Sequence, residues 1–212
     1  MKLKESIIPI FLTKLYCYHF LEDNILNECK KTFNLSINNY VEKFNLNSDS
    51  ILGKIIHTED LLNDSTAPLA DFILNKSYDI LVEQGYLMET FETFLIDFWG
   101  QSINKYASHF NHVHPYGSHI SGFYFLDVPN SQTFPMFFDP RPSKVQNSLP
   151  FKFDSNHLDS KNFITTNVSP GDLIITNSWL GHGFEINLSE FPLNFIHFNI
   201  GVISKDNIYE RE

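Results

Sequence analysis

The chain has 212 residues, enough for one domain with a sizeable core, and its 42% of hydrophobic residues opposes disorder. There are 25 acidic against 15 basic residues, and the resulting formal charge of −10 opposes general binding to a nucleic-acid backbone. Two cysteines cannot form a disulfide framework or a zinc knuckle. The apolar patches near the start are interrupted by Pro9, Lys14 and His19, a pattern that fits neither a signal peptide nor a membrane span. We therefore expect a reduced, cytoplasmic protein that binds no membrane.

Residues 1–90 are predicted to be mainly helical. In residues 20–34 the apolar side chains share one helical face, and Asp23 is a suitable N-cap. Residues 37–57 are polar, and we assign them a helix followed by a loop. The strongest pattern predicts a helix over residues 69–84 that packs outside the core.

Residues 91–205 change to a strand-like period of two. Segments rich in aromatic and β-branched residues alternate with turn signals, without intervening helices. This order predicts an α+β class, with two facing antiparallel sheets braced by the N-terminal helices in a single domain over residues 1–212. Residues 139–162 hold three prolines and little periodicity, and so long a loop predicts a functional role as a substrate cover.

The spacing of His112 and His114 indicates a metal site. Side chains at i and i+2 of a strand project to the same face, so two imidazoles can bind one ion. His182, just after an apolar strand, is the candidate third ligand. Three protein ligands with open positions are typical of a catalytic metal site rather than a structural one.

Chance remains a competing explanation, because a His-x-His pair also arises without a metal. His109 and His119 are expected at the surface or behind the ligands. His197, within a predicted strand, is equally well explained as a core histidine with a hydrogen-bonded partner.

Six motifs in order give the chain a recognisable pattern. They are Trp99, His112-Val113-His114-Pro115, Ser121-Gly122-Phe123-Tyr124-Phe125-Leu126, Asp139-Pro140-Arg141, Pro170-Gly171-Asp172-Leu173 with Ser178-Trp179-Leu180-Gly181-His182, and Phe198-Asn199. The pattern resembles a bacterial and phage group of iron(II)/2-oxoglutarate-dependent oxygenases of unassigned substrate. This resemblance implies a double-stranded β-helix, a jelly-roll of the cupin-like kind, over residues 91–205.

The resemblance also implies iron(II) held by His112, His114 and His182. In the superfamily the second ligand is more often a carboxylate, so His114 leaves the site one negative charge short. Asp127 and Asp139 are candidates for a compensating acid.

The residues that would bind the cosubstrate, 2-oxoglutarate, depart from the family pattern. Where the superfamily places a basic residue for the distal carboxylate of 2-oxoglutarate this chain has Leu193, and where it often has a tyrosine the chain has Phe125. Arg141 is the central arginine that could replace them. Other candidate residues are Lys105, Lys144 and Lys152 as substitute cations, and Tyr124, Ser178 and Asn199 as pocket-lining groups.

The sequence thus predicts a non-haem iron(II)/2-oxoglutarate-dependent dioxygenase, or hydroxylase, that uses dioxygen. The expected substrate is a small molecule or a protein side chain of unspecified identity. Three alternatives stay open: a cupin-like metal-binding protein that does not use 2-oxoglutarate, a degenerate binding module, and a structural phage protein.

Overall fold

A computed structural model describes residues 10–19, 22–114, 116–129, 134–147, 149–150 and 158–207. Helices in this part of the chain are α1 (Asp23–Lys43), α2 (Ala67–Glu83) and α3 (Pro142–Gln146), with 3-10 turns at Leu158–Ser160 and Lys205–Asn207. The strands are β1 (Tyr16–His19), β2 (Ile55–Asp60), β3 (Phe91–Ile103), β4 (His109–His112), β5 (Ile120–Asp127), β6 (Pro135–Phe138), β7 (Phe163–Thr165), β8 (Asp172–Asn177), β9 (His182–Phe184) and β10 (Leu193–Ser204).

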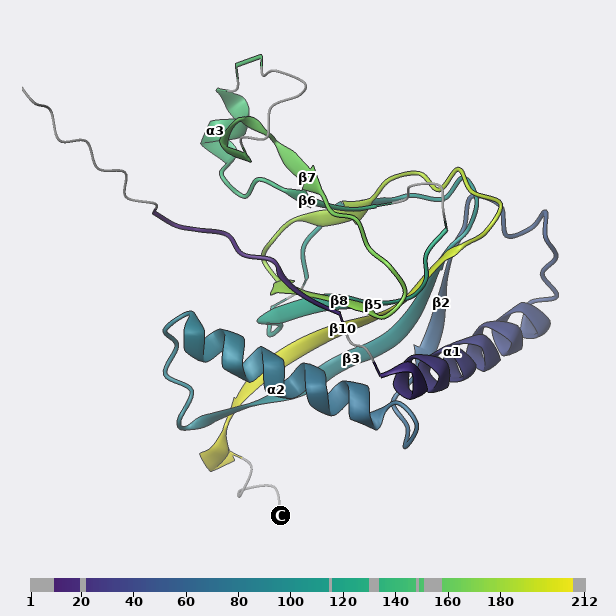
Figure 1. Ribbon diagram of the computed structural model, residues 1–212, viewed down its shortest axis with the longest axis horizontal. Coiled ribbons are helices and arrows are strands. Elements are labelled where there is room, and N and C mark those ends of the chain that lie inside the picture. The colour runs from purple at the N-terminus through teal and green to yellow at the C-terminus, as the bar shows by residue number, and fades with distance from the viewer. Residues whose placement is uncertain are drawn as a thin grey trace, which may run out of the picture.

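The strands form two sheets whose pairs are all antiparallel. One sheet has six strands in the order β1-β8-β5-β10-β3-β2, and the other has four in the order β4-β9-β6-β7. Figure 1 shows β6 and β7 of the smaller sheet facing β8, β5, β10 and β3 of the larger one. This arrangement confirms the predicted α+β class and jelly-roll core.

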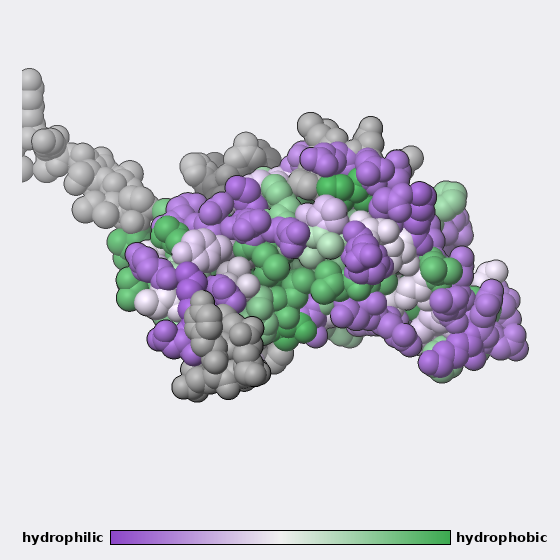
Figure 2. All heavy atoms as spheres, turned by 90° about the horizontal axis from the view of Figure 1, so that it is seen from below, coloured by the Kyte–Doolittle hydropathy of each residue, from purple (hydrophilic) through white to green (hydrophobic). Residues whose placement is uncertain are grey.

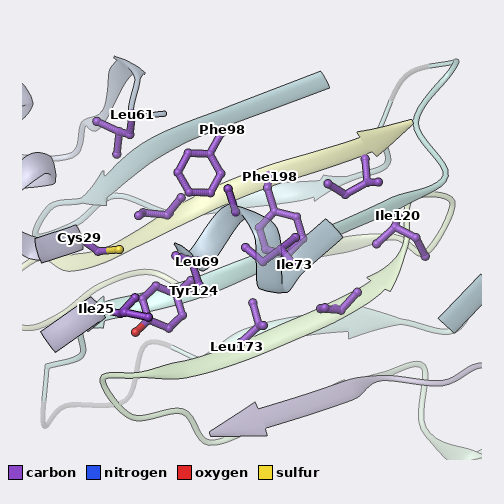
Figure 3. Packing of buried hydrophobic residues seen from close by; sticks show 14 of the residues in the cluster. Ile25, Cys29, Leu61, Leu69, Ile73, Phe98, Ile120, Tyr124, Leu173 and Phe198 are labelled. Atoms are coloured by element: carbon purple, nitrogen blue, oxygen red, sulfur yellow. The ribbon is translucent and has the colours of Figure 1, made fainter. Parts of the chain in front are cut away.

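Helices α1 and α2 cover the outer face of the six-stranded sheet (Figure 1). Their buried side chains, such as Cys29 of α1 and Ile73 of α2, pack against Tyr124, Leu173 and Phe198 of the strands (Figure 3). The predicted helix over residues 69–84 is confirmed in type and position. Figure 2 looks onto this side of the molecule, where hydrophobic side chains lie among polar ones.

A second core fills the space between the two sheets. It is made of buried aromatic and aliphatic side chains, among them Phe123, Phe125, Phe195 and Leu193. Because side chains alternate along a strand, the residues between them, such as Tyr124 and Ile196, belong to the helix-side core instead.

The N-terminal part departs from the prediction in three places. Residues 55–60, the first three of which fall in the predicted loop, form β2, and residues 16–19 form β1; both lie at edges of the large sheet. Their pairing with distant β3 and β8 supplies the hydrogen bonds, which local patterns cannot predict. Helix α1 starts at Asp23, and Glu22 rather than Asp23 is its N-cap.

The remaining expectations concern membrane spans and the 139–162 segment. In the described ranges, no helix is both long and apolar enough to cross a membrane. The described part of the 139–162 segment includes α3, which projects beyond β6 and β7 in Figure 1. Residues 148 and 151–157 of the expected substrate cover lie outside the described residues, so the cover stays a prediction.

Candidate metal centre

Three chain segments bring His112, His114 and His182 together. His112 ends β4 and pairs with His182, which begins β9. Two residues beyond His112, the backbone N–H of His114 donates a hydrogen bond of 3.1 Å to the carbonyl of Ser178, in the turn after β8. The small sheet and this turn therefore fix all three backbones.

The three imidazoles converge on one point. One ring nitrogen of each lies within 4.8 Å of the others, and Nε2 of His114 is 2.9 Å from Nε2 of His182. Two nitrogens bound to one ion at about 2.0–2.2 Å are roughly 3 Å apart when their bonds are at right angles. The spacing of these side chains therefore fits a divalent metal ion.

Backbone carbonyls orient two of the rings. Nδ1 of His112 lies 2.9 Å from the carbonyl oxygen of Phe110, and Nδ1 of His182 lies 2.9 Å from that of Leu180. An Nδ1–H that donates to a carbonyl leaves Nε2 with its lone pair free, which is the tautomer that a metal ligand requires.

Burial keeps the rings of His182 and His114 neutral and available to a metal. Desolvation lowers the pKa of His182 to about 3 and that of His114 to about 4, and neighbouring imidazoles lower both further. Asp97 acts against this at His114, because its carboxylate favours the charged ring. Protons therefore compete little with a metal at these two ligands near neutral pH.

The buried rings predict acid sensitivity of the metal-free protein. His182 and His197 stay neutral in the folded state because burial lowers their pKa, whereas an unfolded chain protonates them below about pH 6.5. The unfolded state then binds more protons, so the free energy of unfolding falls by up to about 1.4 kcal/mol per pH unit per ring as pH drops from 6.5 to 5. Urea unfolding with a chelator present measures this slope. A slope that is the same in His182→Ala as in the wild type would contradict the role given to that ring.

Two site residues were missed or left open by the sequence. His197 of β10 is buried, and its Nε2 lies 3.2 Å from Nε2 of His114. Asp97 of β3 pairs in register with Asn199 of β10, whose amide donates to its carboxylate at 3.0 Å. Only strand register brings Asp97 here, so no local signal in the sequence could have identified it.

The structure places the three predicted pocket-lining residues in different environments. Tyr124 is buried in the core under helix α1, beside Cys29. The preceding Phe123, on the opposite face of β5, is the residue whose ring contacts that of His182. A pocket role for Tyr124 is therefore wrong, because strand alternation turns it outward (Figure 3). Ser178 lies at the site and binds His114 through its backbone, while its hydroxyl donates to the carbonyl of Ser118. Asn199 holds Asp97.

The candidate cations are engaged elsewhere. The guanidinium of Arg141 is 55% exposed and donates two hydrogen bonds of 2.9 Å to the carboxylate of Asp139, whose pKa it lowers to about 2. Lys144 also lies 3.3 Å from Asp139, and Lys105 pairs with Glu190. Lys152 lies outside the described residues.

The proposed compensating acids, too, have their own partners. Asp139 binds Arg141, and Asp127 pairs with Lys30 at 2.9 Å. Asp97 is the carboxylate that influences the pKa of His114.

Aromatic rings close the inner side of the histidine cluster. Phe125, Phe195 and Leu193 are all completely buried, and the Phe195 ring stacks on Phe184 with centroids 4.8 Å apart. A carboxylate between these side chains would lose its hydration without gaining a hydrogen bond, at a cost of several kcal/mol. The described residues therefore do not fit a 2-oxoglutarate carboxylate in the position that the family pattern implies.

A jelly-roll with three converging imidazoles at the edge of its smaller sheet is typical of non-haem metalloproteins. Residues 97–199, which carry all three histidines, match the model of a family described as "Putative 2OG-Fe(II) oxygenase". This part of the chain is therefore similar to the 2OG-Fe(II) oxygenases, which are enzymes. The sequence-based resemblance is confirmed.

Solved structures show the same fold. AviO1 from Streptomyces viridochromogenes is 13% identical, with a TM-score of 0.58 over 89% of this chain and 90% of that one. HygX from Streptomyces hygroscopicus, with nickel, 2-oxoglutarate and hygromycin B bound, is 14% identical, with a TM-score of 0.57 over 89% and 83%. A prolyl-4-hydroxylase of Pseudomonas putida is 13% identical, with a TM-score of 0.52 over 88% and 92%. No curated protein matches the chain in sequence.

Proposed function

We propose that this protein is an iron(II)- and 2-oxoglutarate-dependent dioxygenase that hydroxylates its substrate, with iron bound by His112, His114 and His182. The observation that carries the proposal is the 2.9 Å approach of two Nε2 atoms within a triad whose ring nitrogens lie within 4.8 Å. Similarity to the family supports the same chemistry.

Each residue around the triad has a definable task. The carbonyls of Phe110 and Leu180 hold two rings in the ligating tautomer. The rings of Phe123 and Phe137 lie 5.2 and 6.5 Å from that of His182 and exclude water from it. When bound, iron(II) supplies dioxygen activation at its open positions.

A cavity beside the turn that carries Ser178 supports binding of an apolar substrate group. It has a volume of about 300 Å³ and is bounded by Ser178 and Trp179 on one side and by Tyr86 and Leu87 on another. Ser178 connects the cavity to the site, because its carbonyl accepts a hydrogen bond from the backbone N–H of His114; the three histidines themselves do not line the cavity. We propose that it receives a small molecule or the side chain of a protein substrate.

The proposal includes the wider organisation of the chain. Residues 91–205 act as the catalytic core and residues 1–90 as its support, in a single domain. The net charge of −10 favours a cytoplasmic enzyme without general affinity for nucleic acid, and the composition fits a phage or bacterial origin.

A second candidate function has its own observation. The closed wall of Phe125, Phe195 and Leu193 favours a cupin-like metal protein that does not use 2-oxoglutarate. Such a protein would keep the metal site but bind other ligands at its open positions.

Anaerobic titration of the tag-free iron(II) protein with 2-oxoglutarate separates the two functions. We expect a visible charge-transfer band that grows with the keto acid, and succinate formation once air is admitted. His182→Ala should give no band, since it lacks a ligand. If the wild type binds iron(II) but shows neither band nor succinate at millimolar 2-oxoglutarate, the second candidate holds.

A further inference from the structure

Asp97 lies on the face of the large sheet that meets the metal centre. Strand β3 pairs with β10, and Asp97 is opposite Asn199. Two residues further along β3, Trp99 is opposite His197 and stacks on its ring. Nε2 of His197 is 3.2 Å from Nε2 of His114, so this part of the strand pair faces the triad. Side chains two residues apart on a strand share a face, and Asp97 therefore lies on that face too.

The carboxylate of Asp97 is held by a neutral partner. The buried amide of Asn199 donates to its Oδ2 at 3.0 Å, whereas its Oδ1 has no hydrogen-bond donor among the described residues. In the same part of the chain, no lysine or arginine forms an ion pair with Asp97, while Asp127 and Asp139 each pair with a basic side chain. The negative charge of Asp97 is therefore not offset by a neighbouring cation.

The triad itself brings no negative charge to an ion. Three neutral imidazoles bind a divalent cation through lone pairs alone, and a carboxylate nearby lowers the energy of the loaded centre by Coulomb attraction. Burial and the imidazole of His112 lower the pKa of His114, and the charge of Asp97 acts against them. A negative charge that favours a proton on this ring also favours a metal ion bound to it.

We propose that Asp97 compensates the charge of the metal centre: it stabilises the bound ion without being a ligand, and Asn199 fixes its carboxylate in place. The register of β3 against β10 and the hydrogen bond of 3.0 Å from Asn199 give it this position. The inference rests on the proposed function, since it needs the triad to hold a metal.

The charge of Asp97 also affects the redox behaviour of the centre. Coulomb attraction grows with the charge of the ion, so a fixed carboxylate stabilises iron(III) more than iron(II). Asp97 therefore lowers the reduction potential of bound iron. A residue with a purely structural role would leave this potential unchanged.

Asp97→Asn tests the inference, because it removes the charge and keeps the shape of the side chain. The amide of Asn199 can still donate to the new carbonyl, so we expect the fold to be preserved. Calorimetric titration of the tag-free protein with Co²⁺ should show binding weakened by roughly 10–100-fold, and voltammetry of the iron-loaded protein should show a more positive reduction potential. Asp97→Glu, which keeps the charge, should recover most of the lost affinity.

Asp127→Asn is the matched control, because it removes the same charge from the protein. Asp127 ends β5 and is opposite Asn194, near the other end of the β5–β10 pair from Asn199. The affinity for Co²⁺ and the reduction potential of this variant should equal those of the wild type.

The outcomes separate this inference from the proposed function. Unchanged affinity and potential in Asp97→Asn overturn the role of Asp97 and leave the triad intact, even if the variant is less stable in urea. An equal loss of affinity in Asp127→Asn also overturns it, because net charge alone would then explain the effect. No Co²⁺ binding by the wild type overturns the metal centre itself. If Asp97→Asn does not fold by circular dichroism, the smaller and uncharged Asp97→Ser is measured with the same expected results.

Discussion

His182→Ala should weaken binding of divalent metal at least a hundredfold, about 2.7 kcal/mol, and abolish turnover. The ring is completely buried at the centre of the cluster, where its Nε2 approaches that of His114 to 2.9 Å. A water molecule can occupy the position of the lost nitrogen on the ion. It would not be held in a fixed orientation, as the Leu180 carbonyl holds the His182 ring. Equilibrium dialysis against Fe²⁺ under argon measures the affinity.

His19→Gln is the control for this substitution. It removes a histidine that lies on β1 and pairs with Asp172, away from the triad. Its metal affinity should equal that of the wild type. Equal affinities of the His182→Ala variant and the wild type would mean that the ion binds elsewhere.

Phe195→Ala should lower the free energy of unfolding of the metal-free protein by about 3–5 kcal/mol. The side chain is completely buried between the sheets and contacts three rings, those of Phe123, Phe125 and Phe184. Removing it leaves a cavity that the surrounding strands cannot fill. Urea unfolding with a chelator present measures the loss, separately from any effect of metal.

Phe191→Ala provides the comparison, because Phe191 is 72% exposed in the loop before β10. Its truncation should change stability by no more than about 0.5 kcal/mol. Similar losses in the two variants would show that the aromatic wall is not a packed core, and would reopen the inner side of the pocket to a carboxylate.

The period-two pattern after residue 90 predicted the sheets correctly, and the apolar pattern over residues 69–84 predicted α2. The short edge strands β1 and β2 escaped prediction because their stability comes from pairing with β8 and β3. The alternation of side chains around Tyr124 shows that neighbouring residues of β5 point to opposite faces of the sheet. The position of the smaller sheet decides which of these faces the histidines lie against, so the sequence assigned Tyr124 to the wrong face.

The sequence by itself pointed to the His112–His114 pair through its i, i+2 spacing, although His114 lies beyond the end of β4, where the carbonyl of Ser178 binds its backbone N–H. It also determined the absence of a basic residue at Leu193, because identity at a position needs no coordinates. Only the tertiary structure decided that His197 and Asp97 join the cluster and that Arg141 is held by Asp139. The positions of His197 and Asp97 depend on the register of β10 against β3, two strands about a hundred residues apart in sequence. Such a register is set by the burial of one whole face of the sheet, and no local sequence pattern determines it.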